Sequence, residues 1–428
     1  MGNTGKTLRS CVRYVLATYV LLLALFVGTM TVAHLIPHRS IEGNVASSVE
    51  TLSREGKYPC LLGVPLFRID TFTDALMLNM AWCADEVHPV DAAMQNLYYT
   101  DDAMNVFERT QEVVSGKVTP SGYYYSYARY WHGYQVVLRP LLVLADYHSL
   151  CRCNTILMGL TILLCLWIVA SRLSPRTAAF LLVSLLMVAV PMVPLCFQYS
   201  TCFYVSLWAV IALLAVPHLS RDATATACTF FVIGGITSFL DLLTTPVLTL
   251  GLPLLVCLLA HPAWQSVRRV VQLSACWLAG YVALWVSKCL LAQVLTDYDI
   301  LGSFLRALGV RSFAGTGNLV SSAAELLGPH GALLLAAALL ALLLLLVLVG
   351  VGCWRRASRS PRLRRNAWLL AVALIPVCWY LLTLQHSIVH YWFTWRSLAV
   401  TFFSLFLFLH RLNTAPHETN SHTHSLLQ

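Results

Sequence analysis

Residues 14–35 read YVLATYVLLLALFVGTMTVAHL, a run without any Asp, Glu, Lys or Arg. A helix needs ~20 apolar residues to cross the hydrocarbon core of a bilayer. Further apolar runs lie at 154–171, 177–195, 202–218, 226–240, 245–260, 270–291, 331–353, 366–384 and 393–410. The sequence therefore predicts an all-α fold, a polytopic transmembrane bundle of about 10 helices.

The composition of the whole chain agrees with this interpretation. Hydrophobic residues make up 58% of it and charged residues 11%, and the mean hydropathy is +0.71. Soluble domains contain about 25% charged residues. These values exclude a soluble globular enzyme, a disordered protein and a nucleic-acid binder, so membrane lipid is an expected partner and nucleic acid is not.

The charges predict how the chain is oriented. With ten spans, both termini lie on one side, where the loops and termini carry a net charge of +13, and the loops on the other side carry −4. The positive-inside rule places the positive side in the cytoplasm. We therefore expect a multi-pass protein of the cell membrane with both termini cytoplasmic.

The spans divide the chain into four expected parts. These are a cytoplasmic N-terminus with the first span (1–35), a large extracytoplasmic loop (36–153), a nine-helix bundle (154–410) and a cytoplasmic tail (411–428). Within the bundle, the Leu, Ala and Val of 331–353 predict a lipid-facing support helix. The arginine run 355–365 is expected to mark topology and to contact lipid headgroups, and the His-rich tail is expected to be disordered.

The large loop has the features of a structured region. Asp70 can cap a helix through Ala75–Trp82, and Thr100 can cap an amphipathic helix to about Val114. A third, aromatic helix is predicted from about Tyr125 to Tyr147. Such helices next to a first span are typical of elements that lie in the membrane interface. A Cys60–Cys83 disulfide is left open.

The loop also carries a pair of acids. Asp70 and Asp74 are four residues apart, so they share one face of a helix, where two negative charges repel. A fold accepts such a pair when a cation, a metal or a shared proton lies between the carboxylates. The alternative is that both acids only favour the start of a helix. Asp101 and Asp102 are similar but open a more polar segment, so they are weaker candidates.

The basic and aromatic residues that follow could bind a phosphorylated sugar. Arg129, Trp131 and His132 stand among tyrosines in the segment 127–134, and Arg139 comes soon after. Guanidinium groups suit phosphate, and flat rings suit the faces of sugars. The alternative is an aromatic belt at the headgroup level with snorkelling arginines.

Polar residues also stand at the predicted outward ends of several spans. An ionisable side chain within a span costs about 2.5–3.5 kcal/mol. Residues of this kind on the same side predict one outward-facing site, although each alone could serve in a structural ion pair. The candidates are Gln198, Asp241, Lys288, His386, His390 and Arg396.

This architecture resembles the GT-C class of membrane glycosyltransferases. A cytoplasmic N-terminus, one span, a long outer loop and many spans with short cytoplasmic turns are features of that class, in which an acid commonly follows the first span. Here that stretch holds only Glu42, and the pair Asp70 and Asp74 comes later. The segment Asp70–Ala75 is also similar to one in uncharacterised bacterial multi-pass proteins.

The resemblance implies transfer of a sugar from a polyprenyl-phosphate-linked donor to an envelope glycan or glycolipid on the outer face. Asp70 or Asp74 would be the general base or a metal ligand, which leaves a divalent cation, Mg²⁺ or Mn²⁺, open as a cofactor. His386 or His390 would bind phosphate or relay a proton. The departing phosphate's charge would be compensated by Arg129, Arg139, Lys288 and Arg396.

Two other functions remain open. A transporter or flippase for a lipid-linked saccharide would use the same groups for binding without reaction, and it often shows internal repeats. We find no convincing repeat in this chain. A non-enzymatic protein of envelope assembly would not need charged residues at the outer ends of several spans.

Overall fold

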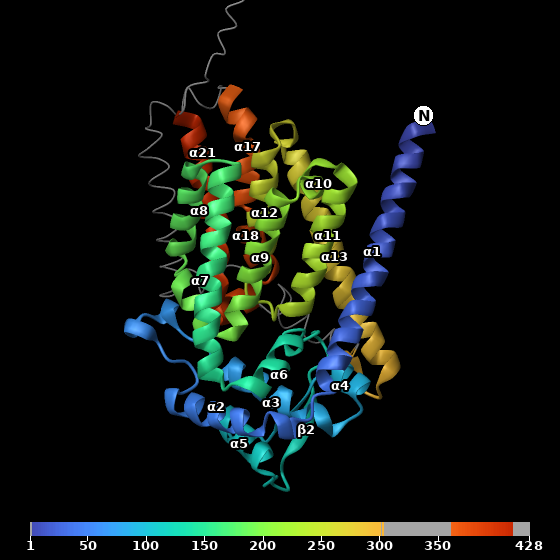
Figure 1. Ribbon diagram of the computed structural model, residues 1–428, viewed down its shortest axis with the longest axis vertical. Coiled ribbons are helices and arrows are strands. Elements are labelled where there is room, and N and C mark those ends of the chain that lie inside the picture. The colour runs from blue at the N-terminus through green and yellow to red at the C-terminus, as the bar shows by residue number, and fades with distance from the viewer. Residues whose placement is uncertain (1, 301, 304–360, 414–428) are drawn as a thin grey trace, which may run out of the picture.

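The computed structural model describes residues 2–300, 302–303 and 361–413. The predicted support helix at 331–353, most of the arginine run 355–365 and nearly all of the tail lie outside these residues. The described part is almost entirely helical, as predicted. Its long helices form one body, and a layer of shorter elements covers one end of that body (Figure 1).

Seven helical segments in the described part are long and apolar enough to cross a membrane. Five are single helices: α1 (Gly2–His34), α7 (Tyr147–Arg172), α9 (Phe197–Ala215), α11 (Ala223–Leu240) and α13 (Val267–Leu295). The other two are the broken segments Leu363–Leu382 and Tyr391–Asn413. They comprise α17 (Pro361–Ala373), α18 (Ile375–Leu382), α20 (Tyr391–Thr394), a 3-10 turn (Trp395–Ser397) and α21 (Leu398–Asn413). The chain is therefore a multi-pass helical membrane protein.

Two of the predicted spans form shorter helices of 13 residues each, α8 (Pro175–Met187) and α12 (Leu248–Ala260). Thirteen residues rise about 20 Å, less than the ~30 Å of a bilayer core. The prolines of the following 3-10 segment, Val190–Leu195, end the helical run of the predicted span 177–195, because proline lacks the N–H that the next turn needs. Of the ten expected spans, seven correspond to long segments and two to short helices among the described residues. The tenth, 331–353, lies outside the described residues.

Residues 36–146, which we call the loop domain, form the layer at one end of the bundle (Figure 1). Its 3-10 turns are His38–Ser40, Leu61–Gly63, Pro65–Phe67 and Ala84–Glu86. Its helices are α2 (Glu42–Glu55), α3 (Thr71–Cys83), α4 (Pro89–Gln95), α5 (Val106–Ser115) and α6 (Gln135–Leu144). Its two antiparallel strands are β1 (Leu97–Thr100) and β2 (Tyr123–Ser126), with Leu97 opposite Ser126.

The loop domain corrects two predictions and answers one open question. The long helix expected over 125–147 is wrong, because β2 pairs with β1, His132 has a φ of 55° and helix α6 begins only at Gln135. The second helix begins at Val106, not after Thr100, because Asn105 and Glu108 form a capping box. Cys60 and Cys83 are both free thiols, so they form no disulfide.

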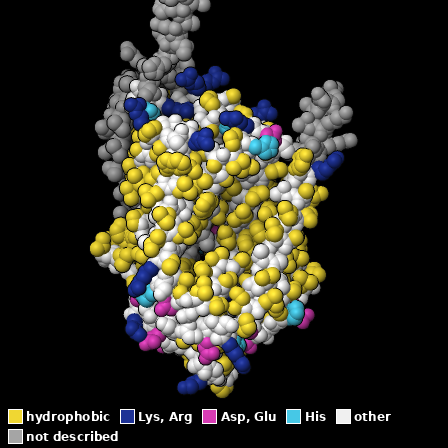
Figure 2. Space-filling model, in the orientation of Figure 1, with side chains coloured by type: hydrophobic (Ala, Val, Ile, Leu, Met, Phe, Trp, Pro, Cys, Tyr) yellow, Lys and Arg dark blue, Asp and Glu magenta, His cyan; other side chains and the backbone are white. Residues whose placement is uncertain are grey.

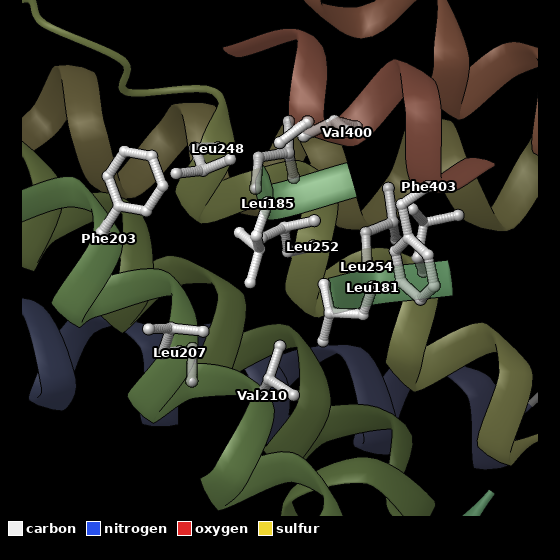
Figure 3. Packing of buried hydrophobic residues seen from close by; sticks show 14 of the residues in the cluster. Leu181, Leu185, Phe203, Leu207, Val210, Leu248, Leu252, Leu254, Val400 and Phe403 are labelled. Carbon is white, nitrogen blue, oxygen red and sulfur yellow. The ribbon is translucent and has the colours of Figure 1, made fainter. Parts of the chain in front are cut away.

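The smaller connecting elements complete the bundle. They are α10 (Pro217–Arg221), a 3-10 turn (Pro262–Trp264) and α19 (Leu384–Val389). The main apolar core lies among α8, α9, α12 and α21, and Figure 3 shows Leu181, Phe203, Leu252 and Phe403 packed there. Separate apolar clusters hold the loop domain together and join α1 to α11 and α13.

Helices α11 and α13 pack closely because glycine lies at their contact. A Cβ on Gly234 would lie 1.9 Å from the carbonyl oxygen of Trp277, and one on Gly280 would lie 2.0 Å from that of Phe231. Small residues allow membrane helices to approach backbone to backbone. This contact fixes the two helices whose outer ends adjoin the loop domain.

The charges separate along the long axis of the molecule. On the face shown in Figure 2, Lys and Arg side chains without many acids gather at the end opposite the loop domain, which we call the basic end, whereas acidic side chains mixed with Lys and Arg lie around the loop domain. This separation is the one that the loop charges predicted. That the basic end is cytoplasmic remains a prediction from the positive-inside rule.

Candidate functional site

A cavity of about 150 Å³ lies between the loop domain and the membrane helices. Among the twelve candidate residues, the structure brings five to its wall: Asp70, His132, Gln198, His386 and His390. They come from α3, the segment before α6, the start of α9, and α19. The remaining lining is Tyr58, Phe72, Thr73, Leu76, Met77, Met80, Tyr127, Tyr134, Leu242 and Phe393. The cavity therefore joins parts of the chain that are far apart in sequence.

Asp70 is the acid that faces this cavity. It caps α3, and its Oδ1 accepts a hydrogen bond of 2.9 Å from the backbone N–H of Thr73, as the sequence predicted. The side chain is 2% exposed. Burial, together with the nearby charge of Asp74, raises the pKa of Asp70 to about 6. A carboxyl group with such a pKa is largely ionised at neutral pH and can still take a proton.

Asp74 has a different role, although it lies on the same helix. Its carboxylate accepts hydrogen bonds from the backbone N–H groups of Phe197 (3.0 Å) and Gln198 (3.3 Å) and from the Tyr147 hydroxyl. These are the first N–H groups of α9, and the residue before that helix supplies no side-chain cap. Asp74 thus caps a membrane helix from the loop domain, and burial raises its pKa to about 6.

The first histidine of the cavity is held neutral. His132 Nε2 donates to the carbonyl oxygen of Tyr127 at 3.1 Å, so Nδ1, 3.0 Å from the Tyr134 hydroxyl, is the acceptor of the ring. Burial, followed by the positive charge of Lys288, lowers the pKa of His132 to about 3. This histidine therefore shapes the wall and does not supply a positive charge.

Of the other two histidines, His386 lies on α19 and His390 directly follows that helix. His386 Nε2 donates to the carbonyl oxygen of Leu243 at 2.8 Å. The rings of His386 and His390 are 4.6 Å apart, and His390 stacks on Phe393 with the ring centres 5.2 Å apart. An imidazole pair and Asp70 thus line the same cavity, and the three groups can bind a polar ligand and move protons.

Gln198 adds unused hydrogen-bonding capacity to the wall. Its Oε1 is buried and accepts no hydrogen bond from any described residue, although its side chain lines the cavity. A buried acceptor without a partner costs about 1–3 kcal/mol. The position therefore suits a ligand that donates a hydrogen bond, such as a sugar hydroxyl.

Two arginines lie close behind this wall. Arg396 donates from Nη1 to the carbonyl oxygen of Trp392 (2.7 Å), and its guanidinium lies 4.6 Å from the centre of the Tyr199 ring. Arg68, which sequence reasoning did not select, lies 5.5 Å from the ring of Tyr58, a cavity residue, and 4.7 Å from that of Trp392. Its signal in the sequence was its place two residues before the capping acid of α3.

The other four basic or aromatic candidates do not line the cavity and bond to protein groups, although the guanidinium of Arg129 lies 5.2 Å from the ring centre of the cavity residue Tyr127. Arg139 donates to the carbonyl oxygens of Ala33 (3.0 Å), Ile36 and Ala81 and pairs with Asp85 at 3.1 Å. Lys288 donates to two carbonyl oxygens at the end of α4, at 2.8 and 2.6 Å. Arg129 donates to Ser303, and the Trp131 indole donates to a carbonyl oxygen of α13. The structure uses these groups to join helices.

Asp241 likewise has a local role. Its carboxylate accepts hydrogen bonds from the backbone N–H of Thr244 at 3.0 and 3.1 Å and from the Thr244 hydroxyl. These bonds close the turn between α11 and α12. The neighbouring Leu242 lines the cavity, so Asp241 holds a wall segment in place without facing the ligand space.

Nothing in the described part assigns a metal to this site. Within residues 2–300, 302–303 and 361–413, no three or more His, Cys, Asp and Glu side chains form a group that could hold an ion. Asp70 is the one acid among the lining residues. The expectation of Mg²⁺ or Mn²⁺ therefore stays a prediction.

Comparison with known proteins adds no assignment. The chain matches no protein-family model, no curated protein and no solved structure. The function is therefore argued from the site.

Proposed function

We propose that this protein is an outward-facing membrane glycosyltransferase whose active site is the cavity around Asp70. It would transfer a sugar from a polyprenyl-phosphate-linked donor to an envelope glycan or glycolipid. The observation that carries the proposal is the convergence of an acid, a histidine pair and an unpartnered amide oxygen in one cavity where the loop domain meets the membrane helices.

Asp70 is the proposed general base. It would take the proton of the acceptor hydroxyl as that oxygen attacks the anomeric carbon, while the bond from this carbon to the lipid phosphate breaks. Its pKa of about 6 suits that role, because the group is ionised at neutral pH without being so acidic that it cannot hold a proton. Asp74 would position the α9 end of the site through its hydrogen bonds.

The donor would lie with its sugar against the aromatic wall and its phosphate towards the basic groups. Tyr58, Tyr127 and Phe393 supply ring faces for a sugar. The His386–His390 pair would contact the phosphate oxygens, and the charges of Arg68 and Arg396, close behind the wall, would stabilise the departing phosphate.

A second cavity supports a lipid-linked substrate. It has a volume of about 980 Å³ and is lined mostly by apolar side chains of α1, α9 and α11. One end lies at His218 and Asp222, near the basic end, and the other at Leu240. Leu242, two residues further along the chain, lines the candidate active site. An isoprenoid chain in this cavity would have its phosphate end near Asp70.

The same cavity also favours the second candidate function, a flippase or transporter for a lipid-linked saccharide. It extends from near the basic end to the edge of the loop domain, as a path for lipid across the membrane would. Such a protein would bind a polyprenyl phosphate and would form no new glycosidic bond. The two functions therefore differ in whether loss of the Asp70 carboxylate stops a reaction or only changes binding.

The decisive experiment is Asp70→Asn, with Asp102→Asn as its matched control. Asp102 is an exposed acid of the same domain, away from the cavity. In cells, Asp70→Asn should reduce transfer of label from lipid-linked sugar to envelope glycan by ~100-fold or more, because an amide cannot accept the proton. Binding of a short-chain polyprenyl phosphate to the purified variant should persist. Normal transfer in Asp70→Asn would refute the enzymatic proposal.

A further inference from the structure

A separate cavity lies at the basic end, opposite the candidate active site. Its volume is about 450 Å³, and α7, α8, α9, α12 and α21 all contribute to its wall. We call it the basic-end pocket. Its lining residues are Arg172, Leu173, Thr177, Leu213, Leu214, Pro217, Ser220, Arg221, Leu259, Ala260, His261, Pro262 and Arg411. The proposed transfer reaction makes no use of it.

The pocket collects positive charge without an acid to balance it. Arg172, Arg221 and Arg411 line it, and none of its lining residues is Asp or Glu. Arg411 is held in place, since its Nη1 donates to Gln265 Oε1 at 2.8 Å. The nearest acid in sequence is Asp222, but its Oδ1 accepts from the backbone N–H of Ala225 at 2.7 Å and caps α11. Three arginine side chains thus line one pocket.

His261 supplies a second, independent sign of a ligand. Its Nε2 is buried and has no hydrogen-bond partner among the described residues, although it lines the pocket. Burial, and then the positive charge of Arg221, lowers the pKa of His261, which favours the neutral ring. A neutral imidazole can donate from Nε2 to an anion that enters the pocket.

A cavity of about 350 Å³, lined by both apolar and polar side chains, adjoins the pocket on the membrane side. Trp167, Ile168, Ser171 and Ala215 line it together with Arg172, which is common to both cavities. The side chain of Trp167 is 67% exposed, so this surface of α7 faces lipid. A ligand that spanned both cavities would have an anionic head and an apolar chain.

We propose that the basic-end pocket binds the phosphate-bearing headgroup of an anionic membrane lipid, with one acyl chain in the groove between α7 and α9. Arginine forms strong charge-assisted hydrogen bonds with phosphate, and basic pockets between membrane helices are suited to lipid headgroups. The lipid would fasten the ends of five helices together in the leaflet opposite the candidate active site. A lipid is favoured over free phosphate because the adjoining cavity leads from Arg172 to Trp167, whose side chain is exposed on the membrane-facing surface of α7.

Thermal unfolding of the purified full-length protein in detergent tests this proposal. Phosphatidylglycerol should raise the Tm of the wild-type protein saturably, whereas phosphatidylcholine should not. Arg172→Gln with Arg221→Gln should weaken the apparent affinity for phosphatidylglycerol by at least ~10-fold, because each lost charged hydrogen bond is worth roughly a factor of ten. Arg268→Gln is the matched control, since Arg268 is exposed at the same end and does not line the pocket.

The single variant Arg221→Glu tests the same pocket in case the double variant does not fold. Arg221 is exposed, so its replacement should leave the Tm without added lipid unchanged while the response to phosphatidylglycerol is lost. Equal stabilisation by phosphatidylcholine would overturn the headgroup assignment. The same shift with inorganic phosphate alone would show a free-anion site in place of a lipid site. An undiminished response in both arginine variants would remove the pocket from lipid binding.

Discussion

Replacing Asp70 with Asn should stabilise the protein at neutral pH, although it should abolish the proposed reaction. In the folded chain, burial raises the pKa of this carboxyl from 3.8 to about 6. One pKa unit corresponds to about 1.4 kcal/mol, so keeping the buried carboxylate ionised costs about 3 kcal/mol of folding free energy. Asn carries no charge, and it caps a helix about as well as Asp. The hydrogen bond from Thr73 N–H should therefore survive.

The gain should depend on pH with a definite sign. Because the pKa of Asp70 is higher in the folded than in the unfolded chain, the wild-type protein loses stability as the pH rises from below 4 to above 6. The Asn variant does not titrate at this position. The difference between the two proteins should thus be small near pH 4 and reach about 3 kcal/mol above pH 7.

The assay is thermal or chemical unfolding of both proteins in the same detergent at a series of pH values. The variant should unfold a few °C higher than the wild type at pH 8. Titrations of other groups cancel in the comparison, because the chains differ at one residue. A variant that was less stable at pH 8, or a difference that did not change with pH, would refute the argument that Asp70 is a buried, unpaired carboxylate. Active sites commonly carry such a cost in stability.

Three further outcomes follow from other contacts. At pH 4, where the charge of Asp74 contributes little, Asp74→Ala should lower the free energy of unfolding by about 1–3 kcal/mol, because the N–H donors of Phe197 and Gln198 lose their acceptor, and unchanged stability would contradict that capping role. Gly234→Ala should cost about 1–3 kcal/mol in thermal unfolding, whereas Gly159→Ala, with no atom within 4 Å of an added Cβ, should be nearly neutral. In a variant without the exposed native cysteines, Ser121→Cys should react with an impermeant thiol reagent on intact cells, and Arg268→Cys should not. The reverse labelling would show that the predicted orientation is inverted.

Much of the fold could be predicted from the sequence because apolar length is a strong local signal. In the described part, the segment 14–35 and the later apolar runs lie largely in helices, and Asp70 caps α3 as expected. The short helices α8 and α12 were less predictable. Hydropathy measures how apolar a stretch is, whereas the prolines in Val190–Leu195 decide where the helix stops.

The error in the loop domain has a specific cause. The predicted helix from about Tyr125 to Tyr147 is wrong at its start, because Tyr123–Ser126 pairs with Leu97–Thr100 as a strand. Both segments are rich in aromatic residues, which favour strands. The turn residues Ser121 and Gly122 stand directly before the second strand. A turn followed by an aromatic segment is a sequence pattern typical of a strand, even in a chain that is otherwise helical.

The sequence could predict that polar residues gather at one end of the molecule. It could not predict which of them line the cavity. Sequence position cannot show which buried cation already has partners. Arg139 has four oxygen contacts, three of them carbonyl oxygens that include Ala33 and Ala81 near the ends of α1 and α3. Lys288 does the same at the end of α4. Carbonyl groups at helix ends have no partner within the helix, so they attract such donors.

Arg396, Arg68 and Arg129 differ from Arg139 and Lys288, because each has a buried side-chain N–H without a hydrogen-bond partner among the described residues. A guanidinium has five N–H donors. Arg396, which is 1% exposed, donates to one carbonyl oxygen, and its Nε and Nη2 have no hydrogen-bond partner among the described residues. The same holds for Nε of Arg68. Buried donors of this kind cost folding free energy unless a ligand meets them. Because both side chains lie just behind the cavity that Asp70 faces, a phosphate ester is the ligand that would satisfy them.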